Sequence, residues 1–357
     1  AASRPASMRQ RQTRRTGLPT TASADVGRIL SIVSQKGGVG KTTTAVNLAA
    51  GVSALGKRTL LIDLDPQAHA TLHLGVEPAE RGSVYDLLLD TSLKLGDVRV
   101  NARENLDVLP AETDLAGLEN ELSAASDRTR RLSNALDQHA AALPAGEKPY
   151  DFVFIDCPPS LGVLTLNGLS SVREVFIPMQ AQFLALQGVS KLMETVKLVR
   201  ATINPRLFVT GVIICAFDAS TTHSKEVVAD LDAFFEQSRG SSEPWANARV
   251  YRPAVRRNVK LAEAPSFGKT IIEYAPWCPG GLDYKQLAQT LVSEWDLLQG
   301  VKPEVAKPTT KTAAKTTSKP AAAPPAAPPA APPAGQPTGQ PVVTVIAPAE
   351  ARPTEPA

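Results

Sequence analysis

Short, almost purely apolar runs recur along the central part of this chain, and longer segments of mixed polarity separate them. The runs are rich in Val, Ile, Leu and Phe, and they cover residues 29–34, 58–65, 151–159, 174–179 and 207–217. Strands of a parallel sheet have this pattern when helices cover both faces of the sheet. The runs therefore predict the strands of a mostly parallel sheet.

The segments between these runs have the composition and periodicity of helices. The clearest helical patterns cover residues 42–56, 113–141, 187–202 and 283–299. The first of them ends at Gly56, which is a suitable residue to cap a helix at its C-terminus. Strands and helices that alternate in this way predict a doubly wound α/β fold, with helices on both faces of the sheet.

The same pattern divides the chain into three zones. Residues 1–26 are polar and basic without periodicity, and residues 301–357 consist largely of Ala, Pro, Thr and Lys. Such segments bury too little apolar surface to fold, so we predict two disordered tails, the second rich in polyproline II. Residues 27–300 are predicted to form one domain. Two interpretations of the lysine-rich stretch 302–319 remain open, namely a solvated tail and a weak DNA-binding arm.

Charge and cysteine content narrow the class of protein only slightly. The 357 residues carry a formal net charge of +3, and the three cysteines (Cys157, Cys215 and Cys278) lie far apart without a CxxC pair. This spacing argues against a disulfide framework or a clustered metal site and suits a reducing cytoplasm. There is neither an apolar run of about 18 residues, as a membrane helix needs, nor the apolar core of a secretory signal. We therefore expect a cytoplasmic protein.

The loop that follows the first apolar run carries the clearest chemistry, SQKGGVGKTT at residues 34–43. A strand, a glycine-rich loop and a helix in this order form a P-loop, in which backbone amides and the helix N-terminus bind phosphate oxygens. We expect Lys41 to reach the β- and γ-phosphates, Thr42 to ligate Mg²⁺ and Thr43 to hold the α-phosphate. The glycines that free the backbone amides are Gly37, Gly38 and Gly40.

Three aspartates at the ends of apolar runs are candidates to complete a magnesium site. Asp156 ends FVFID, the form expected of a Walker B strand, and Asp63 and Asp65 flank Leu64 at the end of another run. Alternate residues of an extended chain share a face, so both carboxylates of this pair can point into one cavity. One of them could support the metal while the other orients the attacking water; alternatively, one of them caps the following helix.

Five motifs, taken in order, resemble one known family. They are KGGVGKTT, LLIDLDPQAHAT, DFVFIDCPPSLGVLTLNGL, IPMQAQFLALQGV and RRNVKLAEAPSFGKTII. Together they resemble the ParA/Soj-type partition ATPases, the ParA branch of the ParA/MinD ATPases with a deviant Walker A motif. The resemblance covers residues 29–299 and implies a P-loop NTPase that uses ATP and Mg²⁺.

The resemblance also implies a role for each matching residue. Lys36 would be the signature lysine that reaches the phosphates of a partner subunit, Lys41 would bind the phosphates of its own subunit, and Asp65 would position the hydrolytic water. Gly37 would face the dimer seam. Thr42, Asp63 and Asp156 would lie at the metal. The full set of implied nucleotide contacts is Gln35, Lys36, Gly37, Gly38, Val39, Gly40, Lys41, Thr42, Thr43 and Asn258.

Members of this family bind double-stranded DNA of any sequence as ATP-bound homodimers, and leave it after a ParB-type protein stimulates hydrolysis. The resemblance therefore implies a nucleoid-associated ATPase of weak intrinsic activity, with Arg256, Arg257 and Lys260 at the DNA. Two departures change the charge of that surface. Arg256 stands where the family usually has proline, and Ser220 stands where it often has arginine.

Two rival classes share the deviant loop. A MinD-like membrane ATPase should end in an amphipathic helix with basic and bulky apolar faces, whereas this chain ends in a Pro-Ala tail. An ATPase that positions a protein cluster or another cargo remains an open alternative. A scaffold that binds ATP without hydrolysing it would not need both Lys41 and Asp65, so we expect an enzyme. Because the expected amphipathic helix is not found in the tail, we do not expect this enzyme to act at a membrane.

Overall fold

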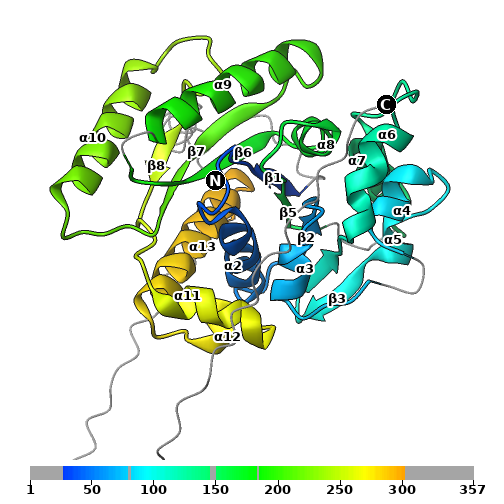
Figure 1. The fold of residues 1–357 in the computed structure, drawn as a ribbon, viewed down its shortest axis with the longest axis horizontal. Helices are drawn as coiled ribbons and strands as arrows, with labels where there is room; N and C mark the ends of the chain where they lie inside the picture. The colour runs from blue at the N-terminus through cyan, green and yellow to red at the C-terminus, as the bar shows by residue number, and fades with distance from the viewer. Residues whose placement is uncertain (1–26, 79–81, 145–149, 183–184, 302–357) are drawn as a thin grey trace, which may run out of the picture. The chain divides into compact units, whose positions relative to one another are not determined.

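A single eight-stranded sheet organises the chain in the computed structural model, which describes residues 27–78, 82–144, 150–182 and 185–301 (Figure 1). The strand order is β3-β4-β2-β5-β1-β6-β7-β8. All neighbouring strands are parallel except β3 and β4. The strands are β1 (Arg28–Ile32), β2 (Thr59–Asp63), β3 (Val100–Arg103), β4 (Leu106–Leu109), β5 (Phe152–Asp156), β6 (Glu174–Gln180), β7 (Phe208–Cys215) and β8 (Arg249–Tyr251).

Helices cover both faces of the sheet, as the apolar runs predict. Alternate residues of one strand enter two separate cores: Leu61 packs on one side of the sheet, and Leu60 and Ile62 pack on the other. The longer helices are α2 (Lys41–Ser53), α7 (Arg131–Ala141), α8 (Val163–Ser170), α9 (Ala185–Thr202), α10 (Thr222–Gln237) and α13 (Pro279–Leu298). This architecture confirms the predicted doubly wound α/β fold.

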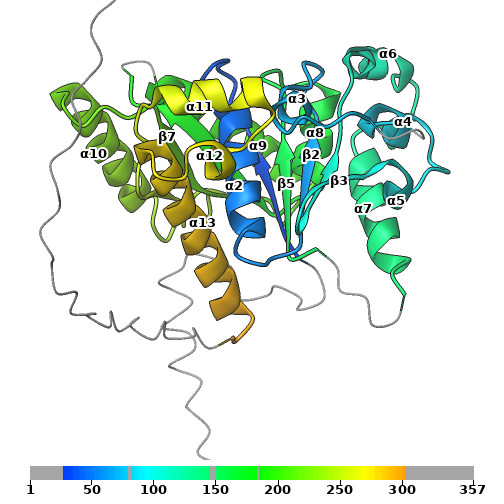
Figure 2. The same cartoon turned by 90° about the horizontal axis from the view of Figure 1, so that it is seen from below.

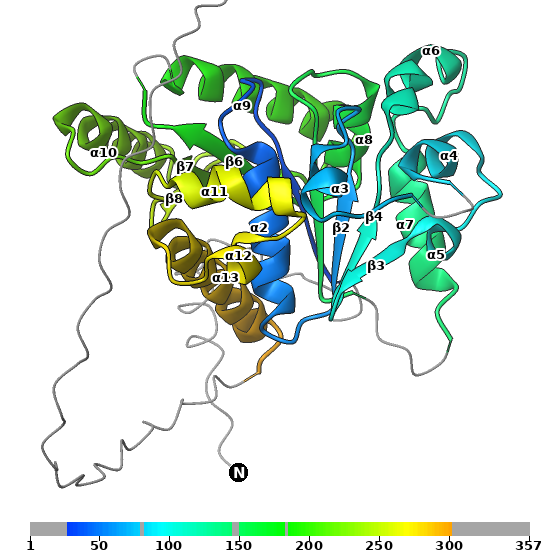
Figure 3. The same ribbon diagram turned by 60° about the horizontal axis from the view of Figure 1, so that its bottom comes forward.

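Each core has its own set of helices. α2 and α13 lie side by side against one face (Figure 2), and α9 and α10 pack on the other face (Figure 3). Short helical segments join them: α3 (His69–His73), α4 (Val84–Leu89), α5 (Leu95–Val98), α6 (Leu118–Glu121), α11 (Val259–Glu263), α12 (Ile271–Tyr274) and the 3₁₀ turns η1 (Thr113–Gly117) and η2 (Ala264–Phe267). No described helix is both long and apolar enough to cross a bilayer.

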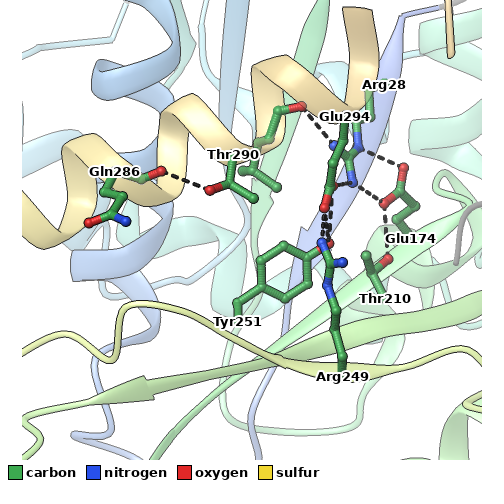
Figure 4. Close-up of polar contacts among 9 residues, drawn as sticks. Arg28, Glu174, Thr210, Arg249, Tyr251, Gln286, Thr290 and Glu294 are labelled. Atoms are coloured by element: carbon green, nitrogen blue, oxygen red, sulfur yellow. Dashed lines mark hydrogen bonds and ion pairs between the residues drawn. The ribbon is translucent and has the colours of Figure 1, made fainter. Parts of the chain in front are cut away.

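A buried group of charged residues fastens α13 to the sheet (Figure 4). Arg28 on β1 donates to Glu174 on β6 at 2.8 and 2.9 Å and to Glu294 on α13 at 3.1 Å. Glu294 also accepts from Arg249 and Tyr251 of β8. The two carboxylates and the Arg28 guanidinium are almost completely buried. Buried charges are unfavourable without partners, and here the pairs within the cluster compensate them.

The helix predicted over residues 113–141 is the main local difference between sequence and structure. The chain instead forms η1, α6 and α7, and residues 123–130 between α6 and α7 are not helical and consist mostly of turns. These residues, SAASDRTR, include Ser, Asp and Thr, whose side chains bond to nearby backbone and compete with a helix. The predicted tails lie outside the described residues, apart from Val301.

Candidate nucleotide site

The predicted phosphate-binding loop and the three predicted aspartates lie at the carboxyl ends of β1, β5 and β2. β5 lies between β1 and β2, and its last residue, Asp156, is directly opposite Ile32 of β1 and Asp63 of β2. The glycine-rich loop continues from β1, and Asp65 follows two residues after Asp63. The strand order therefore brings the loop and all three predicted aspartates together. Ligands of open α/β sheets bind at this edge of the sheet.

The loop has the backbone shape that its glycines allow. Gly38 and Gly40 have φ angles of 71° and 97°, in the left-handed region that other residues rarely adopt. Gly40 is also close to a neighbouring strand, since a Cβ atom there would lie 3.3 Å from the Cβ and Sγ atoms of Cys215 on β7. α2 begins directly after Gly40, so its N-terminal amides point into the loop.

The two lysines of the loop have different surroundings. Lys41 is the first residue of α2 and only 7% exposed. Lys36 is exposed and donates from Nζ to Oε1 of Gln182 at 2.8 Å. Gln182 donates in turn to Gln180 at 2.8 Å, and Gln180 donates to the carbonyl oxygen of Gly38 at 3.0 Å. Lys36 therefore rests on neutral groups of its own subunit.

Asp156 is a buried carboxylate whose oxygens are available to a ligand. Neither of its side-chain oxygens has a hydrogen-bond partner among the described residues. Burial raises the pKa of Asp156 well above its usual range, and the nearby Asp63 raises it further, while the Thr42 hydroxyl and the Lys41 charge lower it. A divalent cation would relieve this unfavourable burial, so the donor set of Thr42 and Asp156 fits magnesium.

Asp63 is fully buried, but its oxygens are engaged. Oδ1 accepts from the backbone amide of Asp65 at 3.1 Å, and Oδ2 accepts from the amide and the hydroxyl of Thr71, both at 2.9 Å. Burial raises the pKa of Asp63 to about 6, although the Thr71 bonds lower it. In this structure Asp63 holds the turn after β2 and accepts from the amide of Thr71 in the first turn of α3, although the N-cap residue of that helix is Ala68. The predicted place of Asp63 at the metal stays a prediction.

The predicted DNA residues follow β8, and two of the three are paired within the chain. Arg256 forms a bidentate pair with Asp283 of α13, with contacts at 2.7 and 2.9 Å. Lys260 donates to Glu263 at 2.7 Å. Arg257 is exposed. Asn258 caps α11 by accepting from the amide of Lys260 at 2.9 Å, so the structure gives this predicted nucleotide contact a local helix-capping role as well.

Three polar residues beside the site had no predicted role. Thr71, Gln180 and Gln182 all fall inside motifs quoted above, LLIDLDPQAHAT and IPMQAQFLALQGV. Thr71 bonds to Asp63, 8 residues away, and to Ala111, 40 residues away, whereas the two glutamines bond to P-loop groups 142 to 146 residues away. The bond between Thr71 and Asp63 lies within one motif, so the sequence held a signal for it. The contacts of the two glutamines with the P-loop arise only because β6 packs beside β1.

The P-loop, the buried lysine and the strand-end carboxylates define a P-loop nucleoside triphosphatase. Comparison with known proteins agrees: the model of the AAA domain family matches residues 27–209. The sporulation initiation inhibitor protein Soj of Bacillus subtilis is 42% identical over 269 residues, which are 75% of this chain and 99% of that protein. The chromosome partitioning protein ParA of Caulobacter vibrioides is 40% identical over 272 residues, which are 76% of this chain and 96% of that protein.

The chain belongs to the ParA/Soj family, which confirms the resemblance drawn from the five motifs. Among solved structures, it is similar to cobyrinic acid a,c-diamide synthase of Mycobacterium smegmatis with bound ATP analogue and magnesium. That structure has a TM-score of 0.62 and 34% sequence identity, and the match covers 76% of this chain and 96% of that one.

Proposed function

We propose that this protein is an ATP-dependent DNA partition ATPase. The observation that carries the proposal is the pair of lysines in one P-loop, Lys41 buried at the start of α2 and Lys36 exposed beside it. The chromosome partitioning protein ParA of Caulobacter vibrioides, at 40% identity, supports the same role. It is more similar to this chain than the synthase structure, at 34%, so a partition function is favoured over a synthase function.

ATP and Mg²⁺ are the proposed ligands of the site. The amides and side chains of residues 35–43 would hold the phosphates, and Thr42 and Asp156 would hold the metal. The unpartnered oxygens of Asp156 support this assignment, as does the ATP analogue and magnesium in the synthase structure. Bound magnesium supplies charge neutralisation at the phosphate oxygens during transfer to water.

The residues of the chain would contribute positioning and charge. Lys41 at the N-terminus of α2 would neutralise the phosphates. Asp65 is nearly buried, and its Oδ1 accepts only from the amide of Gln67 at 3.1 Å among the described residues. Its other oxygen can orient a water molecule for attack. Positioning of this kind suffices, because phosphoryl transfer needs little covalent help from the protein.

Dimerisation would bring Lys36 to the phosphates of a second subunit. Two cationic loops repel each other unless negative charge lies between them, so ATP would favour the dimer. A Cβ atom at Gly37 would meet nothing within 4 Å in a single subunit, so space for the partner exists there. The dimer would bind double-stranded DNA through basic residues near α11, and a ParB-type protein would release it by stimulating hydrolysis.

The test is DNA binding by the full-length protein and by a variant of residues 27–300, each with ADP, ATP and a slowly hydrolysed analogue. We expect binding to DNA of any sequence with ATP and the analogue, and little with ADP. The 27–300 variant should retain this nucleotide dependence, since the site lies within it.

Liposomes of anionic lipid serve as the matched control surface. ATP-dependent binding to liposomes and not to DNA would overturn the proposal in favour of a MinD-like role. Binding to neither surface, with ATP hydrolysis intact, would favour another cargo.

A further inference from the structure

Thr71 joins three parts of the chain at a fully covered position behind the nucleotide site. Its hydroxyl donates to Oδ2 of Asp63 at 2.9 Å and accepts from the backbone amide of Ala111 at 3.0 Å. Its own amide donates to the same Asp63 oxygen at 2.9 Å. Thr71 is 3% exposed, Asp63 is 0% exposed and Ala111 is 2% exposed. One side chain therefore ties α3 to the end of β2 and to the segment after β4.

This junction leads directly to the predicted catalytic aspartate. Asp63 uses its second oxygen, Oδ1, to accept from the backbone amide of Asp65 at 3.1 Å. The direction of the Asp63 carboxylate thus depends on Thr71 on one side and sets the Asp65 backbone on the other. Two hydrogen bonds therefore connect the Thr71 hydroxyl to Asp65: one from the hydroxyl to Asp63, and one from the Asp65 amide to Asp63.

The turn that carries Asp65 is held in a strained shape. Ala68 has a φ of 51°, in the left-handed region that alanine rarely adopts. Its amide donates to the carbonyl oxygen of Asp65 at 2.8 Å, and α3 begins one residue later. A strained residue persists only where the surroundings over-determine it. The bonds from Thr71 to Asp63 provide such a constraint, because they fix the first turn of α3 against β2.

We infer that Thr71 is a positioning residue for ATP hydrolysis, acting on Asp65 through Asp63. The inference rests on the proposed function, since it concerns the same hydrolytic site. Its consequence is specific: loss of the Thr71 hydroxyl slows turnover and leaves nucleotide binding unchanged, because the side chain of Thr71 bonds to Asp63 and Ala111 and not to the P-loop.

The test compares Thr71→Val with Thr71→Ser. Valine keeps the shape of threonine and removes the hydroxyl, whereas serine keeps the hydroxyl. We expect kcat for ATP hydrolysis to fall by about 10- to 100-fold in Thr71→Val, since a displacement of ~1 Å at a reacting group can cost about 100-fold. The KM for ATP and the affinity for a slowly hydrolysed analogue should change by less than about twofold, as expected when a mutation removes an interaction made only in the transition state. Thr71→Ser should restore most of kcat.

Thr210→Val is the matched control. Thr210 is also a buried threonine whose hydroxyl donates to a buried carboxylate, Glu174 at 3.0 Å, but it belongs to the cluster around Arg28, where the parallel strands begin. Thr210→Val should lower thermal stability. At a temperature where both proteins are folded, its kcat should equal that of the wild type. If Thr71→Val is insoluble, Thr71→Ala removes the same hydroxyl without placing a methyl group against Ala111.

The outcomes separate this inference from the proposed function. If the wild type hydrolyses ATP and Thr71→Val keeps its kcat, Thr71 is not a positioning residue and the proposed function stands. Equal losses of kcat in Thr71→Val and Thr210→Val would show a general effect of stability and overturn the inference. If the wild type itself does not hydrolyse ATP, the proposed function fails first.

Discussion

Lys36 and Lys41 lie five positions apart in one loop, but their side chains are held in different ways. Lys41 is buried at the start of α2, where the amides of the helix N-terminus also point. Lys36 is exposed, and its partner is the neutral amide of Gln182. A hydrogen bond to a neutral acceptor is weaker than one to a charged acceptor. A triphosphate on a second subunit would therefore compete successfully for Lys36.

Lys36→Ala is expected to abolish ATP-dependent dimerisation while the subunit stays folded and binds nucleotide. Hydrolysis should fall by about 100-fold or more, because a cation supplied in trans to a transferring phosphoryl group contributes about 10³–10⁵ in kcat. Light scattering, a nucleotide-binding assay and a phosphate-release assay measure dimerisation, binding and hydrolysis separately. Lys94→Ala, at an exposed lysine before α5, is the control and should leave all three unchanged. An ATP-dependent dimer in Lys36→Ala would contradict the role in trans.

At the scale of elements, α13 depends on a buried charge cluster that lies away from the nucleotide. Glu294 on this helix receives hydrogen bonds from Arg28, Arg249 and Tyr251, which come from the first and last strands in sequence (Figure 4). α13 in turn packs along α2 and contacts it through Tyr284, whose hydroxyl lies 3.0 Å from Oγ1 of Thr44. The helix of the P-loop is thus supported by an element near the C-terminal end of the domain.

Glu294→Ala should lower the free energy of unfolding by about 3–5 kcal/mol, the usual effect of removing one partner of a buried ion pair. Chemical denaturation measures this change. Asp232→Ala is the control, because Asp232 and Arg252 form a pair whose side chains are 46% and 56% exposed. Such surface pairs contribute at most about 1 kcal/mol. A similar, small effect of both substitutions would mean that the cluster does not hold α13.

At the scale of the whole molecule, the proposed DNA surface depends on which basic residues keep free charge. Arg256 is bound by both oxygens of Asp283, and Lys260 is bound by Glu263 and lies over the ring of Tyr274. Arg257 is exposed and forms no salt bridge among the described residues, although its charge lowers the pKa of the exposed Asp218. A cation already neutralised by an acid contributes less to binding of DNA phosphates, so the three residues should differ in their effects.

Arg257→Ala is expected to weaken ATP-dependent DNA binding more than Arg256→Ala does. Each phosphate contact contributes about 0.9 to the slope of log affinity against log salt, so the slope should become shallower by about 1 per lost contact. DNA affinity measured over a series of salt concentrations tests this. ATP-dependent dimerisation should be unchanged in both variants. An unchanged slope in Arg257→Ala would remove this residue from the DNA surface.

Much of the fold could be predicted because its signals are local. The apolar runs that became β1, β2, β5, β6 and β7 are short and continuous, and burial on both faces requires that composition. β3 and β8 are edge strands of four and three residues. The polar residues of β3, such as Asn101 and Arg103, leave no apolar run to recognise. The helix expected over 113–141 was wrong for a different reason, because residues 123–130 include Ser, Asp and Thr, which are poor formers of helix interiors.

By itself, the sequence determined the P-loop, the strand-end aspartates and the family, because each depends on neighbours in the chain. Tertiary structure decided which of these groups are available. Asp156 is left with open oxygens, whereas Asp63 is occupied by Thr71 and Asp65. Arg256 is paired by an aspartate 27 residues away, and Lys36 by a glutamine 146 residues away. Pairing across 27 or 146 residues arises only when the strands and helices pack, so no local pattern encodes it.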